Sequence, residues 1–498
     1  MLATDLRLGG AEVIVLEELA APTTESRAST VHARTMEVFE QRGLLPALGD
    51  PPRDPAGHYG GLPLDFSASP TAFPGLWKVA QARVQALLEQ RVHELGGELR
   101  REHTVCGVQA DGDRVRIDVA TPTGSMRLTA GYLVGCDGED STVRRLAGFG
   151  FMGTAATRQL LRADVSGISI RNRRFERLPN GLAIAATRAG VTRVMVHPAG
   201  RPAIPRGSQP SFADVAAAWR CVTGEDISGG RPLWVNAFDD ENRQAGRYRK
   251  GRVLLAGDAA HRQLPVGGQA LNLGLQDAVN LGWKLAAHVA GHASAHLLDS
   301  YHDERHAFGR TVLGNIAAQS LLLLGGAEVE PVRALLRELM EMPRVRDRLA
   351  GMISGLDIRY GQSQDPAIGA RCPDAAFRSP ADGARLRPGL GGPLCSGRGV
   401  LLDLSGDQAC GQRFEDAAAP WADRVMTLAA QAQRGSLFDS RDVLLVRPDG
   451  YVAWAGDRSA DPRPALRHWF GAPRPLSAAA GGAAGRPSAA IGPGAAVK

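Results

Sequence analysis

Cysteine is sparse in this chain and forms no recognisable site. The six cysteines lie far apart, with no C-x-x-C pair and no histidine cluster at the spacing of a metal site. The N-terminus carries Asp5 and Arg7 where a secretory signal needs an unbroken apolar core, and no apolar stretch approaches the roughly 18 residues of a membrane span. The sequence therefore predicts a reduced, cytoplasmic protein with no metal centre and no membrane partner.

Lysine is scarcer still. It occurs only at Lys78, Lys250, Lys284 and Lys498, so the net charge of +6 comes from arginine. The arginines are scattered along the chain, whereas a protein that binds nucleic acid gathers its positive charge in a run or on one face. We expect no nucleic-acid partner.

The order of helix and strand signals indicates several domains. The 498 residues suffice for two to four domains. Helix and strand signals alternate near both ends of the first 360 residues. The segment between these ends is rich in strands whose residues alternate between apolar and polar. We predict an α/β fold with a Rossmann-like domain, interrupted by a mostly antiparallel sheet domain and followed by a C-terminal α/β domain. The expected segments are 1–57, 81–151 and 250–360 for the first domain, 58–80 for an excursion toward the second, 152–249 for the second, 368–474 for the C-terminal domain and 475–498 for a disordered tail.

Some local elements can be given bounds. Helical spacing of apolar residues predicts a helix over 30–45 and another over 81–97, the latter stopped by a glycine pair. A strand is expected over 12–18. Two alternating runs joined by Asp449-Gly450 predict a hairpin over 442–456.

The segment 251–291 has the strongest functional signal. A buried strand ends in Gly257-Asp258, which places a carboxylate at the strand's carboxyl end, where open α/β sheets bind ligands. Pro265 and the glycines at 267 and 268 then form a loop that leads into a helix with Asn272 in its first turn. Backbone N–H groups at such a helix start favour an electron-rich carbonyl or a developing anion.

A second turn precedes the first by more than a hundred residues. In "YLVGCDGEDSTVRRL" (132–146), Asp137-Gly138 ends a strand, Ser141 can cap the following helix, and Arg144 lies three residues beyond Ser141. Taken alone, this pattern is most often a capped turn between a strand and a helix.

Together the two turns identify a resemblance. The pattern D-G-x-x-S-x-x-R, followed by G-D-A-A-H-x-x-x-P-x-G-G-Q-x-x-N, resembles the FAD-dependent aromatic hydroxylases of the p-hydroxybenzoate hydroxylase type. The segments "SRASTVHARTMEVFEQRGL", "GHYGGLPLDF" and "MISGLDIRYG" are similar to the branch that hydroxylates aromatic polyketides, which includes anthracycline, angucycline and tetracycline hydroxylases and rifampicin monooxygenase. Residues 368–474 resemble the thioredoxin-like C-terminal domain of that branch.

The resemblance implies a set of cofactor contacts. Residues at the adenosine and diphosphate end would be Glu17, Glu18, Arg27, Gln81 and Val105, and Asp137 belongs to the same site. Asp258 would hold ribityl and phosphate oxygens. The flavin ring would be lined by Pro265, Gly267, Gly268, Gln269, Ala270, Leu271 and Asn272, where Ala270 replaces a glycine often seen in relatives.

The start of the chain departs from this family. In relatives, a strand and the fingerprint G-x-G-x-x-G precede the helix with which this chain begins, "MLATDLRLGG". Either the start of translation was assigned too late or the gene is truncated or decayed. For the sequence as written we expect weak or absent FAD retention.

The resemblance also implies a reaction and leaves rivals open. NADPH, or NADH, would reduce FAD, O2 would add at C4a, and the resulting hydroperoxide would hydroxylate a polycyclic aromatic compound in an apolar cavity. No catalytic acid or base can be assigned: His261 is better explained as fixing a loop, and the C-terminal domain suits packing or a homodimer contact. The alternatives are a monooxygenase that inactivates a rifampicin-like antibiotic, and a flavin-less binding protein without turnover.

Overall fold

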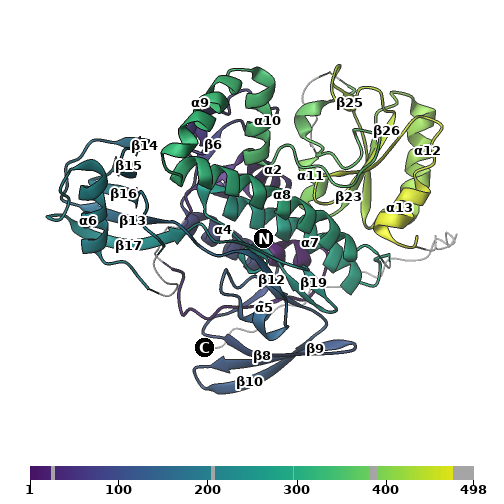
Figure 1. Ribbon diagram of the computed structural model, residues 1–498. Coiled ribbons are helices and arrows are strands. Elements are labelled where there is room, and N and C mark those ends of the chain that lie inside the picture. Colours follow the sequence, from purple (N-terminus) through teal and green to yellow (C-terminus); the bar gives the residue numbers. More distant parts are fainter. Residues whose placement is uncertain (24–27, 204–207, 295, 382, 384–389, 475–498) are drawn as a thin grey trace, which may run out of the picture.

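The computed structural model describes residues 1–498 except 24–27, 204–207, 295, 382, 384–389 and 475–498. The expected tail and the predicted cofactor contact Arg27 lie outside the described residues. Figure 1 shows a central α/β body with an antiparallel sheet and its helix on one flank, and a smaller α/β domain of residues near the C-terminus on the other. The predicted α/β class and the interrupted first domain agree with this arrangement.

The parallel sheet of the central body is in two pieces. β1 (Ile14–Leu16) pairs in parallel with β7 (Glu98–Arg100), and β11 (Leu133–Gly135) pairs in parallel with β20 (Val253–Leu255), which β19 (Arg249–Lys250) extends in antiparallel fashion. Among the described residues, no strand joins β1 to β11. The expectation of weak or absent FAD retention stays a prediction.

Helices of seven to 26 residues cover this sheet. They are α1 (Leu2–Leu8), α4 (Gln81–Glu94), α7 (Gln269–Val289) and α8 (Asp299–Leu324). α1 and α7 approach closely because both have glycine at the contact: a Cβ on Gly9 would lie 2.3 Å from Ala286 Cβ, and one on Gly282 would lie 2.3 Å from Asp5 Cβ. Any side chain at either position would force the two helices apart.

The segment around residue 30 differs from the predicted single helix. Thr30–His32 forms β2, and α2 (Ala33–Gln41) begins only afterwards. Val31 is fully buried opposite Trp77 of β6 (Leu76–Lys78), which favours an extended backbone there. The remaining elements of this part are α3 (Leu45–Leu48), β3 (Arg53–Asp54), and the hairpin of β4 (Ala56–Tyr59) and β5 (Leu62–Asp65).

A three-stranded antiparallel sheet at the bottom of Figure 1 lies between β7 and β11 along the chain. It consists of β8 (Thr104–Asp111), β9 (Arg114–Thr121) and β10 (Gly124–Ala130). The short helix α5 (Thr142–Leu146) then leads toward the second domain.

The antiparallel domain is a five-stranded sheet in the order β14-β15-β16-β13-β17. α6 (Phe212–Thr223) packs on one face, where Trp219 is fully buried, while the other face turns toward α8 and the loop before α7. The strands are β13 (Gln159–Ser166), β14 (Arg173–Leu178), β15 (Gly181–Arg188), β16 (Val191–Pro198) and β17 (Arg231–Asp239). A three-stranded sheet of β12 (Phe151–Thr154), β18 (Asn242–Ala245) and β21 (His261–Arg262) connects this domain to the central body.

The C-terminal domain has a mixed four-stranded sheet. Its order is β24-β23-β26-β27, with β23 and β24 parallel and the other pairs antiparallel. The predicted hairpin is confirmed by β26 (Val443–Val446) and β27 (Val452–Gly456), with Gly450 at φ +78° in the turn. The other elements are β22 (Phe377–Arg378), α11 (Gly391–Cys395), β23 (Gly399–Asp403), α12 (Gln408–Ala418), β24 (Val425–Ala429), β25 (Gln431–Ala432) and α13 (Arg463–Phe470).

One helix qualifies the expectation about membrane spans. α8 is long and apolar enough to cross a membrane by length and composition, but 56% of its most apolar window is buried inside the protein. A core helix of a folded domain passes the same test. Between α8 and the C-terminal domain lie α9 (Glu330–Leu339) and α10 (Pro343–Ser354).

Candidate functional site

The turn after β20 brings a carboxylate to the edge of the parallel sheet. Gly257 has φ +64° and begins a 3-10 turn, Gly257–Ala259, in which Asp258 is exposed. This turn lies against the first turns of α7, because a Cβ on Gly274 would be only 3.2 Å from Gly257 Cα. Two glycines thus allow backbone to meet backbone beside the exposed Asp258.

The loop before α7 is built on two more glycines. Gly267 (φ +66°) and Gly268 (φ +71°) are both left-handed, and a Cβ on Gly268 would lie 3.4 Å from Thr30 Cβ. No acidic residue occurs in the first turn of α7, so its N–H groups keep their positive potential. Pro265 is exposed, while Ala270 and Leu271 are partly exposed beside the loop.

Asn272 holds this loop to β2 and α2. Its Oδ1 accepts hydrogen bonds from the backbone N–H of His32 at 2.8 Å and from Thr35 Oγ1 at 2.7 Å. Its Nδ2 donates to the carbonyls of Thr30 at 3.1 Å and Gly268 at 2.8 Å. The side chain expected to line a ligand is therefore fully used inside the protein, and we assign Asn272 to the frame of the loop.

His32 completes that frame. Its Nε2 lies 2.9 Å from the carbonyl oxygen of Gly267, and because a carbonyl only accepts, the imidazole proton resides on Nε2. Burial lowers the pKa of His32 to about 4, so the ring is neutral at pH 7. Gln269 is also buried here, and its Nε2 has no hydrogen-bond partner among the described residues.

The two turns recognised in the sequence are joined by Arg144. Ser141 caps α5 as predicted, its Oγ accepting from the backbone N–H of Arg144 at 2.9 Å. Asp137, expected at the cofactor, accepts from Ser141 Oγ and from the backbone N–H of Val143, which commits its side chain to this helix start. Arg144 reaches across to donate to the carbonyl of Ala259 at 2.9 Å, directly after Asp258.

Of the residues expected at the adenosine and diphosphate end, Glu17 and Val105 lie near one another. Glu17 follows β1, and its carbonyl accepts from the backbone N–H of His103, two residues before Val105 in β8. Its carboxylate accepts from the backbone N–H of Leu19, and the neighbouring Glu18 is exposed. Gln81 opens α4 and accepts from the backbone N–H of Ala28 at 3.0 Å.

His261 fixes a loop, as the sequence analysis expects. It is fully buried, and its Nε2 lies 2.7 Å from Oδ2 of Asp277 in α7. The same oxygen accepts from the backbone N–H of Gly257 at 3.1 Å. The sequence analysis did not identify Asp277 as a functional residue. The signal that could have identified it was a carboxylate in the middle of a mostly buried helix.

These features fit a flavin cofactor. The loop before α7 has two left-handed glycines, the first turn of α7 contains no acidic residue, and Asp258 stands at the end of a parallel strand. Among the described residues there is no group of three or more His, Cys, Asp or Glu side chains that could hold a metal ion.

Comparison with known proteins decides the family. Residues 1–315 match the family model described as "FAD binding domain", and residues 365–473 match "Aromatic-ring hydroxylase, C-terminal". The chain belongs to the FAD-binding aromatic-ring hydroxylases.

Relatives within this family cover nearly the whole chain. The 12-dehydrotetracycline 5-monooxygenase/anhydrotetracycline 6-monooxygenase of Streptomyces rimosus subsp. rimosus is 42% identical, covering 95% of this chain and 97% of the relative. Rifampicin monooxygenase of Streptomyces venezuelae is 36% identical over 95% and 96%. The crystal structure of CabE, an aromatic hydroxylase from angucycline biosynthesis, is 46% identical over 95% and 97%, with a TM-score of 0.88. The protein is thus a flavin-dependent aromatic monooxygenase.

Proposed function

We propose that the protein hydroxylates a polycyclic aromatic polyketide, using FAD and an NAD(P)H reductant and incorporating one atom of O2. The observation that supports this most is the closeness of the Asp258 turn, which Arg144 contacts, to the start of α7, where Asn272 fixes the left-handed glycine loop. Bound FAD would supply the redox and oxygen chemistry. A cytoplasmic location is part of the same proposal.

The chain's own residues would divide the work of binding. Asp258 would accept hydrogen bonds from ribityl hydroxyls, with Glu17 and Val105 at the adenosine end. The ring end would rest on Pro265, Gly267, Gly268, Gln269, Ala270 and Leu271, whose backbone N–H groups and helix start favour the electron-rich edge of a reduced ring.

The substrate would meet the antiparallel sheet on the far side of this loop. Leu264 and Val266 of the loop share one apolar cluster with Leu160 and Leu182 of the sheet and Ile316 of α8. Phe175, Phe238 and Met195 pack against the same cluster. Such a wall suits a flat, multi-ring compound and excludes water from the reacting centre.

The test is to titrate the purified protein with FAD and then follow NADPH oxidation with a panel of anthracycline, angucycline and tetracycline precursors. One of them should stimulate oxidation and gain one oxygen atom derived from ¹⁸O2, measured by mass spectrometry. A rifamycin as the stimulating compound would favour antibiotic inactivation. No spectral change with millimolar FAD would favour the flavin-less binding protein and contradict the proposal.

A further inference from the structure

Two buried residues join α7 and α8 directly beneath the Asp258 turn. Asp277 of α7 and Arg305 of α8 have side chains that are 1% and 0% exposed. Arg305 Nε donates to Asp277 Oδ1 at 2.7 Å. Burial opposes the charge of Asp277, but Arg305 and His261 outweigh it and keep its pKa below the ordinary value.

The carboxylate of Asp277 divides its two oxygens between two tasks. Oδ1 faces Arg305, whereas Oδ2 receives the backbone N–H of Gly257 and Nε2 of His261. Gly257 and His261 flank Asp258 on either side along the chain. The orientation of this one carboxylate therefore fixes both ends of the turn that presents Asp258.

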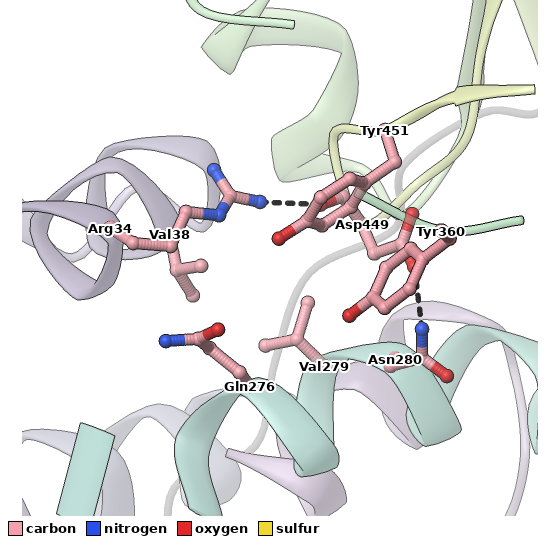
Figure 2. A pocket seen from close by; sticks show the side chains of 8 residues that line it. All are labelled: Arg34, Val38, Gln276, Val279, Asn280, Tyr360, Asp449 and Tyr451. Atoms are coloured by element: carbon pink, nitrogen blue, oxygen red, sulfur yellow. Dashed lines mark hydrogen bonds between the residues drawn. The ribbon is translucent and has the colours of Figure 1, made fainter. Parts of the chain in front are cut away.

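Arg305 also connects Asp277, through Tyr360, to the C-terminal domain. It donates to the hydroxyl of Tyr360 at 3.0 Å and to the carbonyl of Leu273 at 3.2 Å. The ring of Tyr360 lies 4.5 Å from that of Tyr451 in the β26–β27 hairpin, and the guanidinium of Arg447 lies 5.1 Å from the Tyr360 ring. Figure 2 shows Tyr360 and Tyr451 beside Asp449, facing α7 across a cavity of about 10 Å³.

A second layer of charges fixes that hairpin to the same two helices. Glu304, next to Arg305, accepts from Arg447 at 2.6 and 2.9 Å and from Lys284 at 2.7 Å. Asn280, one turn beyond Asp277, donates to Asp449 at 3.3 Å. The C-terminal domain is thus seated on the helices that frame the turn.

We propose that Asp277 is a positioning residue for the cofactor, through which the C-terminal domain, acting by way of Tyr360 and Arg305, holds the Asp258 turn in its binding geometry. This inference rests on the proposed flavin site. It assigns the C-terminal domain a role in cofactor binding.

The experiment compares Tyr360→Phe with Tyr451→Phe in the full chain. The first substitution removes the hydroxyl that accepts from Arg305, and the second removes a hydroxyl from the adjacent ring and leaves the Arg305–Asp277 contact intact. Asp277→Asn is the third variant, because it has nearly the same shape but cannot accept from all three donors. For each we measure the FAD dissociation constant, hydrogen exchange of the peptide 255–262 in the apoprotein, and the melting temperature of the apoprotein.

Tyr360→Phe should weaken FAD binding about fivefold and Asp277→Asn at least about tenfold, the size expected when a buried hydrogen bond is lost. Both should speed exchange at 255–262. Tyr451→Phe should leave affinity and exchange near the wild-type values. A merely structural role would lower the melting temperature without this selective effect on the turn.

Equal behaviour of Tyr360→Phe and Tyr451→Phe overturns the inference. If Asp277→Asn does not fold, the comparison of the two tyrosine variants still decides. If the wild-type protein binds no FAD, the proposed function fails, and the exchange of 255–262 in the apoprotein tests the coupling by itself.

Discussion

The two halves of α7 are held in the protein by different kinds of interaction. At its start, Asn272 and His32 fix the glycine loop with neutral hydrogen bonds, four of them made by Asn272. Its middle and far parts are held by charges, with Asp277 against Arg305 and Lys284 against Glu304. The neutral half faces the proposed cofactor, and the charged half faces α8 and the C-terminal domain.

The two halves of α7 differ because only the first has to leave its backbone N–H groups available to the proposed cofactor. A carboxylate beside the loop would compete with the electron-rich ring edge for the N–H groups at the helix start, whereas the neutral side chains of Asn272 and His32 position the loop without adding charge. At the domain junction no ligand has to enter. Buried charges are tolerated there because each is paired, and an unpaired one would be costly.

The largest effect is expected in the charged half. Arg447→Met removes a cation that Glu304 and Asp449 share and leaves both carboxylates buried, Glu304 with Lys284 and Asp449 with the neutral donor Asn280, so the free energy of unfolding should fall by about 4 kcal/mol. Urea unfolding followed by tryptophan fluorescence measures this, since Arg447 lies 5.5 Å from the Trp283 ring and 4.9 Å from the Trp469 ring. The matched control is Arg127→Met at the exposed Asp118 pair, where a change well below about 1 kcal/mol is expected.

The neutral half should respond next. Asn272→Ala leaves the buried groups that now bond to Asn272 without a partner. We therefore expect the free energy of unfolding to fall by about 3 kcal/mol and FAD binding to be lost. Asn180→Ala removes a single exposed hydrogen bond to Cys221 and serves as control. Unchanged FAD affinity in Asn272→Ala would show that the loop does not need this frame.

The interactions of the two halves of α7 should lose their contribution to stability in different ranges of acid pH. Because the pKa of His32 is about 4 in the folded protein and 6.5 in the unfolded chain, the unfolded state binds the extra proton first and stability falls as pH drops from 6.5 toward 4. The contribution amounts to about 2 kcal/mol by pH 5. His32→Gln should remove this part of the pH dependence, measured as the difference between the two unfolding profiles.

The charged half should titrate in a lower window. Burial opposes ionisation of Glu304, but Arg447 and Lys284 lower its pKa to about 2, so its contribution to stability is complete above about pH 4.5 and is lost progressively as the pH falls from 4.5 to 2. A His32→Gln protein that keeps the full loss between pH 6.5 and 5 would contradict the separation of the two windows.

The smallest effect tests the loop itself. Gly268→Ala places a Cβ in a left-handed residue next to Thr30 and should cost about 1 kcal/mol. Gly291→Ala has φ +73° with nothing within 4 Å and should cost the same. We expect only Gly268→Ala to weaken FAD binding, as read by flavin fluorescence. Equal FAD affinity of the two variants would remove the loop from the proposed site.

Much of the framework was predictable because its signals are local. The Asp449-Gly450 hairpin, the Ser141 cap and the strand–loop–helix around Asp258 each lie within about forty residues of sequence and depend on backbone geometry that glycine, proline and serine impose. The error at Thr30–His32 has the opposite origin. The helical spacing predicted the helix correctly from Ala33 onward, but pairing with β6 makes Thr30–His32 a strand.

The sequence by itself determined the α/β class, the family and the position of the Asp258 turn, because short motifs fix turns and the ends of strands. Only the tertiary structure decided what the polar side chains around that turn do. Asn272 and Asp277 find partners far along the chain, 237 residues away for Thr35 and Asn272 and 28 for Arg305 and Asp277. Asp137, by contrast, bonds within its own turn, to Ser141 and Val143. A hydrogen bond or buried ion pair depends on distance in space, and that distance exists only once the chain has folded.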